Sequence, residues 1–256
     1  MENENLMQST LRDIVLLEAV GINPVIVHGG GKAITRALAQ KGLSGNFVQG
    51  LRVTSAAAVN VVRQVLDFEV NPTIVKHLES LGGWARGISG TKIFSAKPLE
   101  PLLLPDNSRV DLGYVGDIGR VEADLVRACL DHQVIPVISP LGSNDEGQVY
   151  NINADVAAME LAIALQAEKL IYLSDVPGVL RNAHDESSVI PTIKSSDVEE
   201  LIIGGAISGG MIPKIRSAVA SLQRGVGKVQ FIDGRTPHSL LLEIFTDAGI
   251  GTEIVP

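Results

Sequence analysis

Apolar residues along this chain recur at two spacings that alternate from segment to segment. Spacings of three to four residues predict helices over residues 6–20, 32–41, 53–65, 72–81, 122–131, 154–165, 198–203, 210–223 and 237–245. Short β-branched runs predict strands at 25–27, 134–138, 169–173, 229–232 and 252–255, and runs broken by glycine and proline predict hairpins between 84 and 118. Strands that alternate with helices predict an α/β fold with a mainly parallel sheet covered on both faces.

Composition narrows the classes of protein to which the chain can belong. Its 256 residues include 21 basic and 29 acidic side chains, and the formal net charge of −8 argues against nucleic acid or a membrane surface as a partner. No apolar run reaches the roughly 18 residues of a membrane helix, and the first ten residues do not resemble a secretory signal. The single cysteine, Cys129, excludes an intrachain disulfide and a cysteine-based metal site. We therefore expect a soluble cytoplasmic protein with no protein-held metal.

The segment Pro24–Gly31, PVIVHGGG, carries the strongest chemical signal. A predicted strand runs into His28 and three glycines, and a predicted helix follows. Glycines let the backbone approach a ligand, and the N–H groups and dipole of the helix N-terminus favour an anion. The turn therefore predicts a site for phosphate, carboxylate or a reacting oxyanion, and His28 is expected to pack or bond within the turn.

Other polar segments stand where strands end or helices begin. Arg52 precedes a helix capped by Thr54 or Ser55, and it is either a solvated charge or a clamp on a carboxylate. Asn153 is expected to cap the helix that follows. The carboxyl ends of parallel strands share one edge of a sheet, so His28–Gly31 and Ser174–Asp175 predict one common crevice.

An esterase is the main competing interpretation. HGGG is typical of an oxyanion hole, and Ser208 lies in a near miss to a nucleophile elbow, with Asp233 and His238 following in hydrolase order. Two glycines precede the serine segment where a strand should lead into the elbow, and Asp233 and His238 are close together for separate triad loops. Both features disfavour this interpretation.

Taken in order, five segments resemble the amino-acid kinase family, and within it the branch that acts on N-acetyl-L-glutamate. They are PVIVHGGG (24–31), GLRVT (50–54), NINAD (151–155), LIYLSDVPGVL (170–180) and GGMIPK (209–214). The resemblance implies a three-layer αβα sandwich around a mainly parallel open sheet. It implies one domain over residues 1–256, with an amino-acid-substrate lobe at about 1–165 and a nucleotide lobe at about 166–256.

The resemblance also assigns roles to residues on the amino-acid side. Gly30 and Gly31 match the glycines that receive the substrate and the transferred phosphate. Arg52 matches the arginine that clamps the α-carboxylate, and Asn151 matches an asparagine near it. Asp155 resembles the aspartate that organises the catalytic lysines.

On the nucleotide side, Lys214 matches the lysine that stabilises the transition state. The implied reaction is transfer of the γ-phosphate of ATP, with Mg²⁺ on the nucleotide, to the side-chain carboxylate of N-acetyl-L-glutamate, in arginine biosynthesis. The residues that fall where the family wraps ATP are Asp175, Val176, Pro177, Gly178, Val179 and Leu180, followed by Ala206, Ile207 and Ser208.

The C-terminal segment resembles the arginine-inhibited branch, which implies an L-arginine effector site at His238, Glu243 and Gly251 and a homo-oligomer. The chain departs from the family pattern in two places. Ser89-Gly90-Thr91-Lys92 stands where relatives show serine, glycine, lysine and aspartate. No Lys-x-Gly-Gly strand precedes Val25, so we expect the N-terminal strand and a second catalytic lysine to be missing, and the activity of the chain as given to be weakened. The alternatives are a kinase for a related acidic amino-acid substrate and a weakened, arginine-binding regulatory paralogue.

Overall fold

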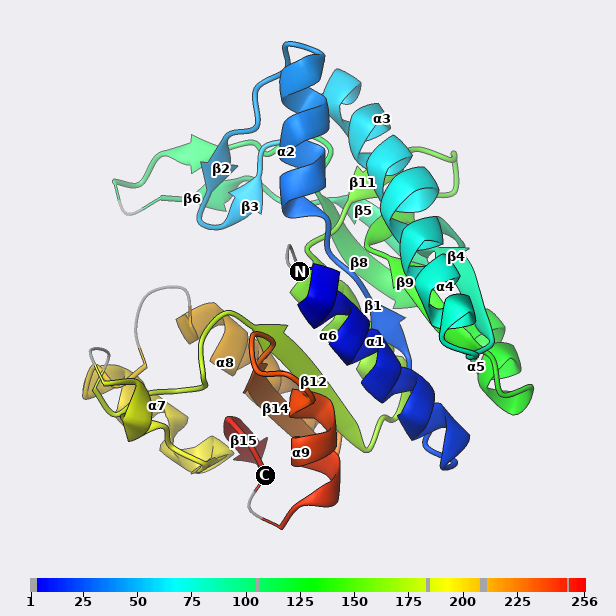
Figure 1. The fold of residues 1–256 in the computed structure, drawn as a ribbon. Helices are drawn as coiled ribbons and strands as arrows, with labels where there is room; N and C mark the ends of the chain where they lie inside the picture. The colour runs from blue at the N-terminus through cyan, green and yellow to red at the C-terminus, as the bar shows by residue number, and fades with distance from the viewer. Residues whose placement is uncertain (1–3, 105, 183–184, 208–210, 248) are drawn as a thin grey trace. The chain divides into compact units, whose positions relative to one another are not determined.

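The computed structural model of this chain describes residues 4–104, 106–182, 185–207, 211–247 and 249–256. The chain divides into two compact units (Figure 1). The continuous unit is Asn23–Ala157, and the discontinuous unit combines Met1–Ile22 with Ala158–Pro256. Each unit has its own sheets, and each is described by itself.

A three-stranded parallel sheet forms the centre of the continuous unit. Its strands are β1 (Ile26–Val27), β9 (Ile135–Ser139) and β4 (Ala85–Ser89), in the order β1-β9-β4. Every residue of β9 is buried, because α4 (Asn71–Ser80) and α5 (Asp124–Asp131) pack against it. The carboxyl ends of the three strands meet at one edge, which also carries the glycine turn.

The region between residues 84 and 118 is only partly made of hairpins. β5 (Phe94–Pro98) with β8 (Gly116–Val121), and β6 (Leu102–Leu103) with β7 (Arg109–Val110), are antiparallel pairs as predicted. The hairpin prediction is wrong for β4, which is a parallel strand. Its Gly87 is there for packing, since a Cβ at this position would overlap the side-chain oxygen of Asn71.

A second sheet of this unit has the order β11-β10-β5-β8, with β10 (Leu141–Ser143) and β11 (Val149–Asn151). A separate short pair is β2 (Phe47–Val48) with β3 (Leu51–Arg52). A 3₁₀ turn, Gly90–Lys92, follows β4. The strands of the continuous unit therefore include parallel and antiparallel pairs.

The helices that the sequence predicts at 53–65 and 72–81 are joined without a break. α3 (Ala56–Val65) leads through a π-helical turn, Leu66–Val70, directly into α4. Ser55 caps α3 by accepting a hydrogen bond from the N–H of Ala58 at 3.2 Å, as expected. α2 (Gly31–Gln40) packs on α3 around a buried aliphatic cluster that includes Leu38, Val62 and Leu66.

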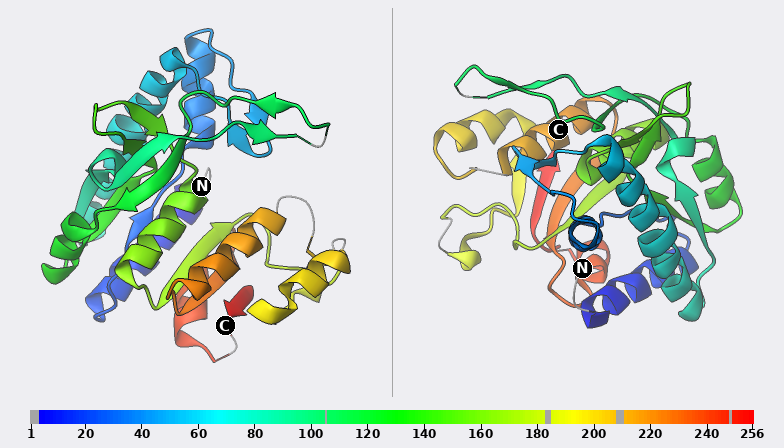
Figure 2. Two further views of the ribbon diagram at one scale, coloured as in Figure 1. Left: turned by 180° about the vertical axis from the view of Figure 1, so that it is seen from behind. Right: turned by 90° about the horizontal axis from the view of Figure 1, so that it is seen from above.

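The discontinuous unit is built on a four-stranded sheet with the order β12-β14-β15-β13. The strands are β12 (Lys169–Ser174), β14 (Lys228–Asp233), β15 (Thr252–Val255) and β13 (Thr192–Lys194). β14 and β15 are antiparallel, whereas β12 with β14 and β13 with β15 are parallel. The two views in Figures 1 and 2 place α8 (Met211–Gln223) and α9 (Ser239–Phe245) on opposite faces of this sheet. The buried cluster that includes Ile215 and Ala218 of α8 is aliphatic apart from Tyr172 and Phe231.

The remaining helices are α1 (Glu4–Ala19), α6 (Ala154–Leu165) and α7 (Val198–Ile203), with 3₁₀ turns at Glu186–Ser188 and Ser195–Asp197. α1 packs on α9, and Asp13 Oδ1 lies 2.6 Å from His238 Nδ1. Among the residues that the structure describes, no helix is long and apolar enough to cross a membrane. The fold is a mixed α/β arrangement with mainly parallel central strands, as the sequence predicts.

Candidate active site

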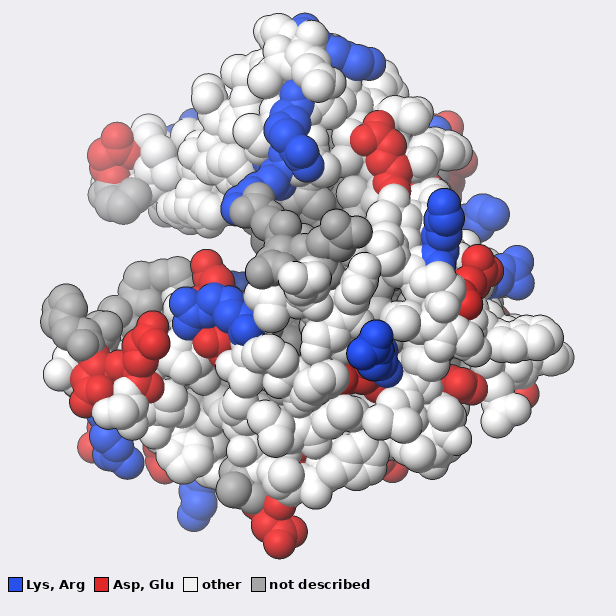
Figure 3. Space-filling view, viewed as in Figure 1, with Lys and Arg blue, Asp and Glu red and all other residues white. Residues whose placement is uncertain are grey.

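The glycine turn of the continuous unit has the geometry of an anion site. It joins β1 to α2, and Gly30 is the N-cap residue of the helix. A Cβ at Gly30 would lie 2.7 Å from Leu66 Cδ2, so a side chain there would enter the core. No hydrogen bond between described residues uses the N–H of Gly29, Gly30 or Gly31. Figure 3 shows basic side chains gathered along α2, which carries Lys32 and Arg36.

Arg52 lies in β3 and is bound to this turn. Only 6% of the residue is exposed, so it is not the solvated charge that the sequence left open. Its Nη2 donates to the carbonyl of Gly31 at 2.9 Å and to Thr35 Oγ1 at 2.8 Å, and its guanidinium lies 4.5 Å from the ring centroid of Phe47. Burial lowers the pKa of Arg52 below its ordinary value, although a guanidinium remains charged in proteins.

One guanidinium nitrogen of Arg52 has an unusual environment. Nη1 is buried without a hydrogen-bond partner among the described residues, and no carboxylate pairs with Arg52 in this part of the chain. A buried charged donor that is left unpaired is unfavourable. The arrangement suits an anionic ligand that would accept from Nη1.

Asn151 is connected to Arg52 through Thr54. Asn151 Nδ2 donates to Thr54 Oγ1 at 3.3 Å, and that hydroxyl donates to the carbonyl of Arg52 at 2.8 Å. Asn153 caps α6 as expected, accepting from the N–H of Asp155 at 2.9 Å and of Val156 at 3.2 Å. Asp155 therefore stands in the first turn of α6.

Two further polar side chains, which no local sequence pattern indicates, form hydrogen bonds at the same edge of the sheet. Asp67, on the π-helical turn, accepts from Ser139 at 2.5 Å and from Ser89 at 2.9 Å, which are the last residues of β9 and β4. Asn71 contacts His28 at 3.1 Å. These contacts join residues far apart in the chain, so no local motif could reveal them.

In the discontinuous unit, the predicted nucleotide segment follows β12. Ser174 pairs with Asp233 at the carboxyl ends of β12 and β14, and Asp175 comes next. Asp233 accepts from Arg235 Nε at 2.9 Å and Nη2 at 2.8 Å, and these bonds lower the pKa of Asp233. Arg235 also interacts with Asp175 through its charge.

A buried hydroxyl fixes the turn from Asp175 to Leu180. Thr252 Oγ1 accepts from the N–H of Val179 at 2.8 Å and donates to the carbonyl of Ile190 at 2.7 Å. Gly178 has a φ of 146°, and a Cβ there would lie 2.6 Å from the same hydroxyl. Thr252, like Arg235, is a residue that the sequence analysis missed.

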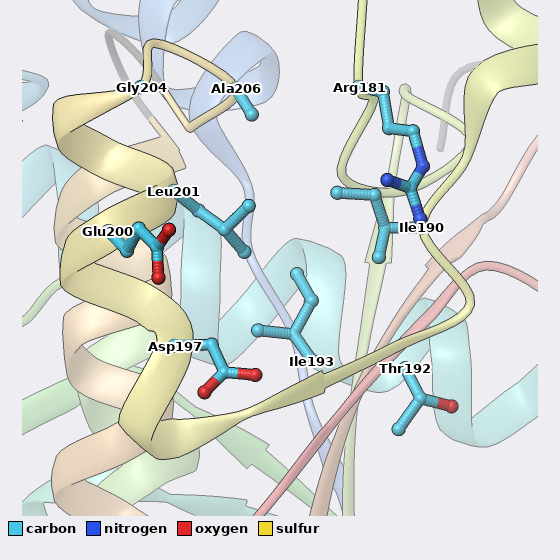
Figure 4. Close-up of a pocket in the computed structure, with 9 residues that line it drawn as sticks. All are labelled: Arg181, Ile190, Thr192, Ile193, Asp197, Glu200, Leu201, Gly204 and Ala206. Carbon is cyan, nitrogen blue, oxygen red and sulfur yellow. The ribbon is translucent and has the colours of Figure 1, made fainter.

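Lys214 stands on α8, with Nζ 6.0 Å from the ring centroid of Tyr172, within the range of a cation–π contact. Ile207 is buried in the core, whereas Ser208 lies outside the described residues. Ala206 lines a cavity of about 550 Å³ between α7 and the hairpin that follows Leu180. In Figure 4, Glu200 and Leu201 project from the helix, and Arg181 stands across from them.

The residues of the expected effector site all lie in the discontinuous unit. His238 has a φ of 58° at the start of α9 and is bound to Asp13. The carboxylate of Glu243 pairs with Lys169 and accepts from Gln230 at 3.0 Å and from the N–H of Ile250 at 2.9 Å. Gly251 has a φ of 82°, and a Cβ there would overlap the carbonyl of Phe231. That this segment binds arginine stays a prediction.

The structure thus brings Gly31, Arg52 and Asn151 together in one unit and places Asp175–Leu180 and Lys214 in the other. That both groups face one crevice stays a prediction, as does the division into lobes at residue 165. The contacts do not support the esterase alternative, because Asp233 is bound to Arg235 and His238 to Asp13. Over the described residues, no group of three His, Cys, Asp or Glu side chains is arranged to hold a metal.

Comparison with known proteins agrees with this geometry. The sequence profile of the amino acid kinase family matches residues 1–233. The chain is 48% identical to an acetylglutamate kinase of Carboxydothermus hydrogenoformans and 47% identical to one of Heliobacterium modesticaldum. Each comparison covers 100% of this chain and 88% of the relative.

Solved structures give the same fold. An N-acetylglutamate synthase of Neisseria gonorrhoeae, in complex with coenzyme A and N-acetyl-glutamate, superposes with a TM-score of 0.81 at 30% identity. It covers 99% of this chain, which spans 57% of that longer protein. A carbamate kinase of Giardia, 14% identical with a TM-score of 0.68 over 97% of this chain and 89% of that one, shares the fold. The chain belongs to the amino acid kinase family.

Proposed function

We propose that this protein transfers the γ-phosphate of ATP to the side-chain carboxylate of N-acetyl-L-glutamate, forming an acyl phosphate and ADP. The observation that carries the proposal is the buried guanidinium of Arg52, whose Nη1 lacks a partner among the described residues, beside a glycine turn with unused N–H groups. The relatives named acetylglutamate kinase, which align over the full chain, support this choice of substrate.

In this proposal the continuous unit binds the amino acid. Arg52 Nη1 donates to the α-carboxylate, and Asn151 binds beside it. The N–H groups of Gly30 and Gly31 hold the side-chain carboxylate and the phosphoryl group as they approach. Phosphoryl transfer needs positioning and positive charge more than covalent chemistry by the protein.

The discontinuous unit, in the same proposal, binds the nucleotide through Asp175–Leu180 and Ala206–Ser208. A carboxylate oxygen of the substrate attacks the γ-phosphorus, and the bond from phosphorus to the ADP oxygen breaks. Lys214 offsets the charge on the transferring group, and Asp155 orients Lys214. Mg²⁺ arrives as part of the nucleotide substrate and neutralises phosphate charge.

The wider setting is part of the proposal. We place the reaction in arginine biosynthesis in the cytoplasm, with a homo-oligomeric enzyme and L-arginine as effector. A related acidic amino acid is the alternative substrate. The buried, unpaired Nη1 of Arg52 can donate to the α-carboxylate of any acidic amino-acid substrate, so a direct measurement is needed to choose between substrates.

A coupled assay of ADP release tests the proposal, with titration calorimetry of each substrate as a second measurement. We expect ADP release that depends on N-acetyl-L-glutamate and that is at least tenfold slower with aminoadipate derivatives. Failure of the chain to bind either substrate would contradict the proposal. Binding of both substrates without turnover would also contradict it and would favour the regulatory alternative, which arginine binding would then identify.

A further inference from the structure

A buried chain of hydrogen bonds that does not include Arg52 leads to the glycine turn. Asn71 Nδ2 lies 3.1 Å from His28 Nε2 and also donates to the carbonyl of Val137 at 2.9 Å. His28 Nδ1 lies 2.8 Å from the carbonyl oxygen of Gly29. Asn71 and His28 are 5% and 7% exposed, so water does not compete for these bonds.

The chemistry of the partners fixes the protonation state of His28. The amide nitrogen of Asn71 can only donate, so Nε2 of His28 must carry a lone pair. The carbonyl of Gly29 can only accept, so Nδ1 must carry the proton. One neutral tautomer satisfies both requirements, and burial lowers the pKa of His28 from 6.5, which favours the neutral ring.

The geometry of the peptide unit links the contact of His28 with the Gly29 carbonyl to the direction of the Gly30 N–H. The carbonyl of Gly29 and the N–H of Gly30 belong to one planar trans peptide unit, so they point in opposite directions. Holding the carbonyl oxygen toward His28 therefore turns the Gly30 N–H away from His28. We propose that Asn71 is a positioning residue, which acts through His28 and the Gly29 carbonyl to aim the N–H of Gly30 at the transferred phosphoryl group. This inference rests on the proposed function.

The surrounding residues are arranged to keep this chain of bonds intact. The bond to Val137 anchors Asn71 to the buried strand β9, and the glycine at position 87 leaves room for the side-chain oxygen of Asn71. The π-helical turn brings Asn71 to the start of α4, and Leu66 of the same turn lies under Gly30. A donor aimed in advance costs no reorganisation when charge develops in the transition state.

The first test is spectroscopic and does not depend on activity. Nitrogen-15 NMR of the full chain at about pH 8 should show His28 protonated at Nδ1 and unprotonated at Nε2, the neutral form that burial favours by lowering the pKa of this ring. In Asn71→Leu the residual dipolar coupling of the Gly30 N–H, which reports the direction of that bond, should change. In Asn60→Leu, at an exposed asparagine of α3, it should not.

The second test is kinetic. We expect Asn71→Leu to lower kcat about tenfold while the KM for ATP stays within twofold, because a donor is misdirected rather than removed. Gly87→Ala should act in the same way by displacing the Asn71 side chain. His28→Asn places an amide N–H near the position of Nδ1 and should keep kcat within about threefold, whereas His28→Gln reaches the position of Nε2 and should lose about tenfold.

The outcomes separate this inference from the proposed function. An unchanged Gly30 coupling in Asn71→Leu would overturn the inference whether or not the protein is an active kinase. Loss of activity in Asn71→Leu with an equal loss in His28→Asn, or with a matching fall in the melting temperature, would assign Asn71 a merely structural role. Absence of turnover in the unmodified chain would contradict the proposed function, and the dipolar couplings would still decide the inference.

Discussion

The two turns that are expected to bind the substrates are stabilised by different kinds of contacts. The glycine turn of the continuous unit is fixed by neutral, buried groups, His28 and Asn71, and by a single buried cation, Arg52. The turn after β12 is fixed by the hydroxyl of Thr252, and its edge carries the Asp233–Arg235 ion pair with Arg235 half exposed. Positive charge is thus uncompensated at the first turn and already paired at the second.

This difference indicates which unit contributes charge to the binding of an anionic ligand. An unpaired buried guanidinium strongly favours an anion, because the ligand supplies the missing acceptor. A paired and partly exposed arginine adds little binding energy of its own. Variants in the two units should therefore change different kinetic constants, and the following predictions use that separation.

Replacing Lys214 should have the largest effect. Lys214→Ala should lower kcat about 100- to 1,000-fold, since one donor to a developing charge is removed, with the KM for N-acetyl-L-glutamate nearly constant. Arg216→Ala on the same helix is the control, because Arg216 is exposed and pairs with Glu199 at the surface. Steady-state kinetics that leave kcat within threefold of the parent would remove Lys214 from the reaction.

Changing Arg52 should separate the units most clearly. Arg52→Lys should raise the KM for N-acetyl-L-glutamate about 10- to 100-fold, because an ammonium cannot reproduce the planar donors of a guanidinium. The KM for ATP should stay close to that of the parent. Arg36→Lys, at an exposed position of α2, is the matched control. Equal changes in both Michaelis constants would argue against a separate amino-acid site.

Thr252 tests the second turn through stability. Thr252→Val should lower the free energy of unfolding by about 1–3 kcal/mol, since the N–H of Val179 and the carbonyl of Ile190 would lose their buried partner. Thr192→Val, at an exposed position of β13, should change it by less than about 0.5 kcal/mol. Urea titrations of the two variants provide the comparison, and similar midpoints would show that the hydroxyl is dispensable.

The smallest effect concerns pH and the neutral histidine. Burial lowers the pKa of folded His28 from 6.5, so the unfolded chain binds a proton more readily. The stabilisation is present above about pH 6.5 and is lost as the pH falls toward the folded pKa, at most about 1.4 kcal/mol per pH unit. Urea unfolding between about pH 5 and pH 8 should show this slope in the parent and a shallower slope in His28→Asn. Parallel curves would mean that His28 keeps an ordinary pKa.

Local signals predicted the helices and their caps well. The apolar spacing gave residues 154–165 for a helix, and α6 has these bounds. The sequence predicts Thr54 or Ser55 as one cap and Asn153 as another, because their oxygens precede apolar periodic segments. Ser55 and Asn153 accept the N–H groups of the first helical turns. A cap depends on a hydrogen bond between residues two or three positions apart, so a single sequence is enough to predict it.

Long-range contacts could not be predicted in this way. Gly87 within β4 and Gly90 directly after it led to the hairpin prediction. The structure explains both glycines by close approach of other segments: Asn71 at Gly87, and the backbone of Ser139 and Leu141 at Gly90. The bonds from Asp67 to Ser139 and from Val179 to Thr252 span 72 and 73 residues. Whether Arg52 is solvated or buried could not be predicted for the same reason, since its burial depends on the fold around β3.

The discontinuous unit is assembled from two segments that are far apart in the chain, which affects how it folds during synthesis. α1 is synthesised before its partner helix α9, and the histidine that binds its Asp13 comes 225 residues later in the chain. The intervening unit, Asn23–Ala157, is continuous in sequence, so it can fold as a unit while synthesis continues. Helix α1, whose Leu11, Ile14 and Leu17 are buried in the folded protein, therefore cannot complete its packing until α9 has been synthesised.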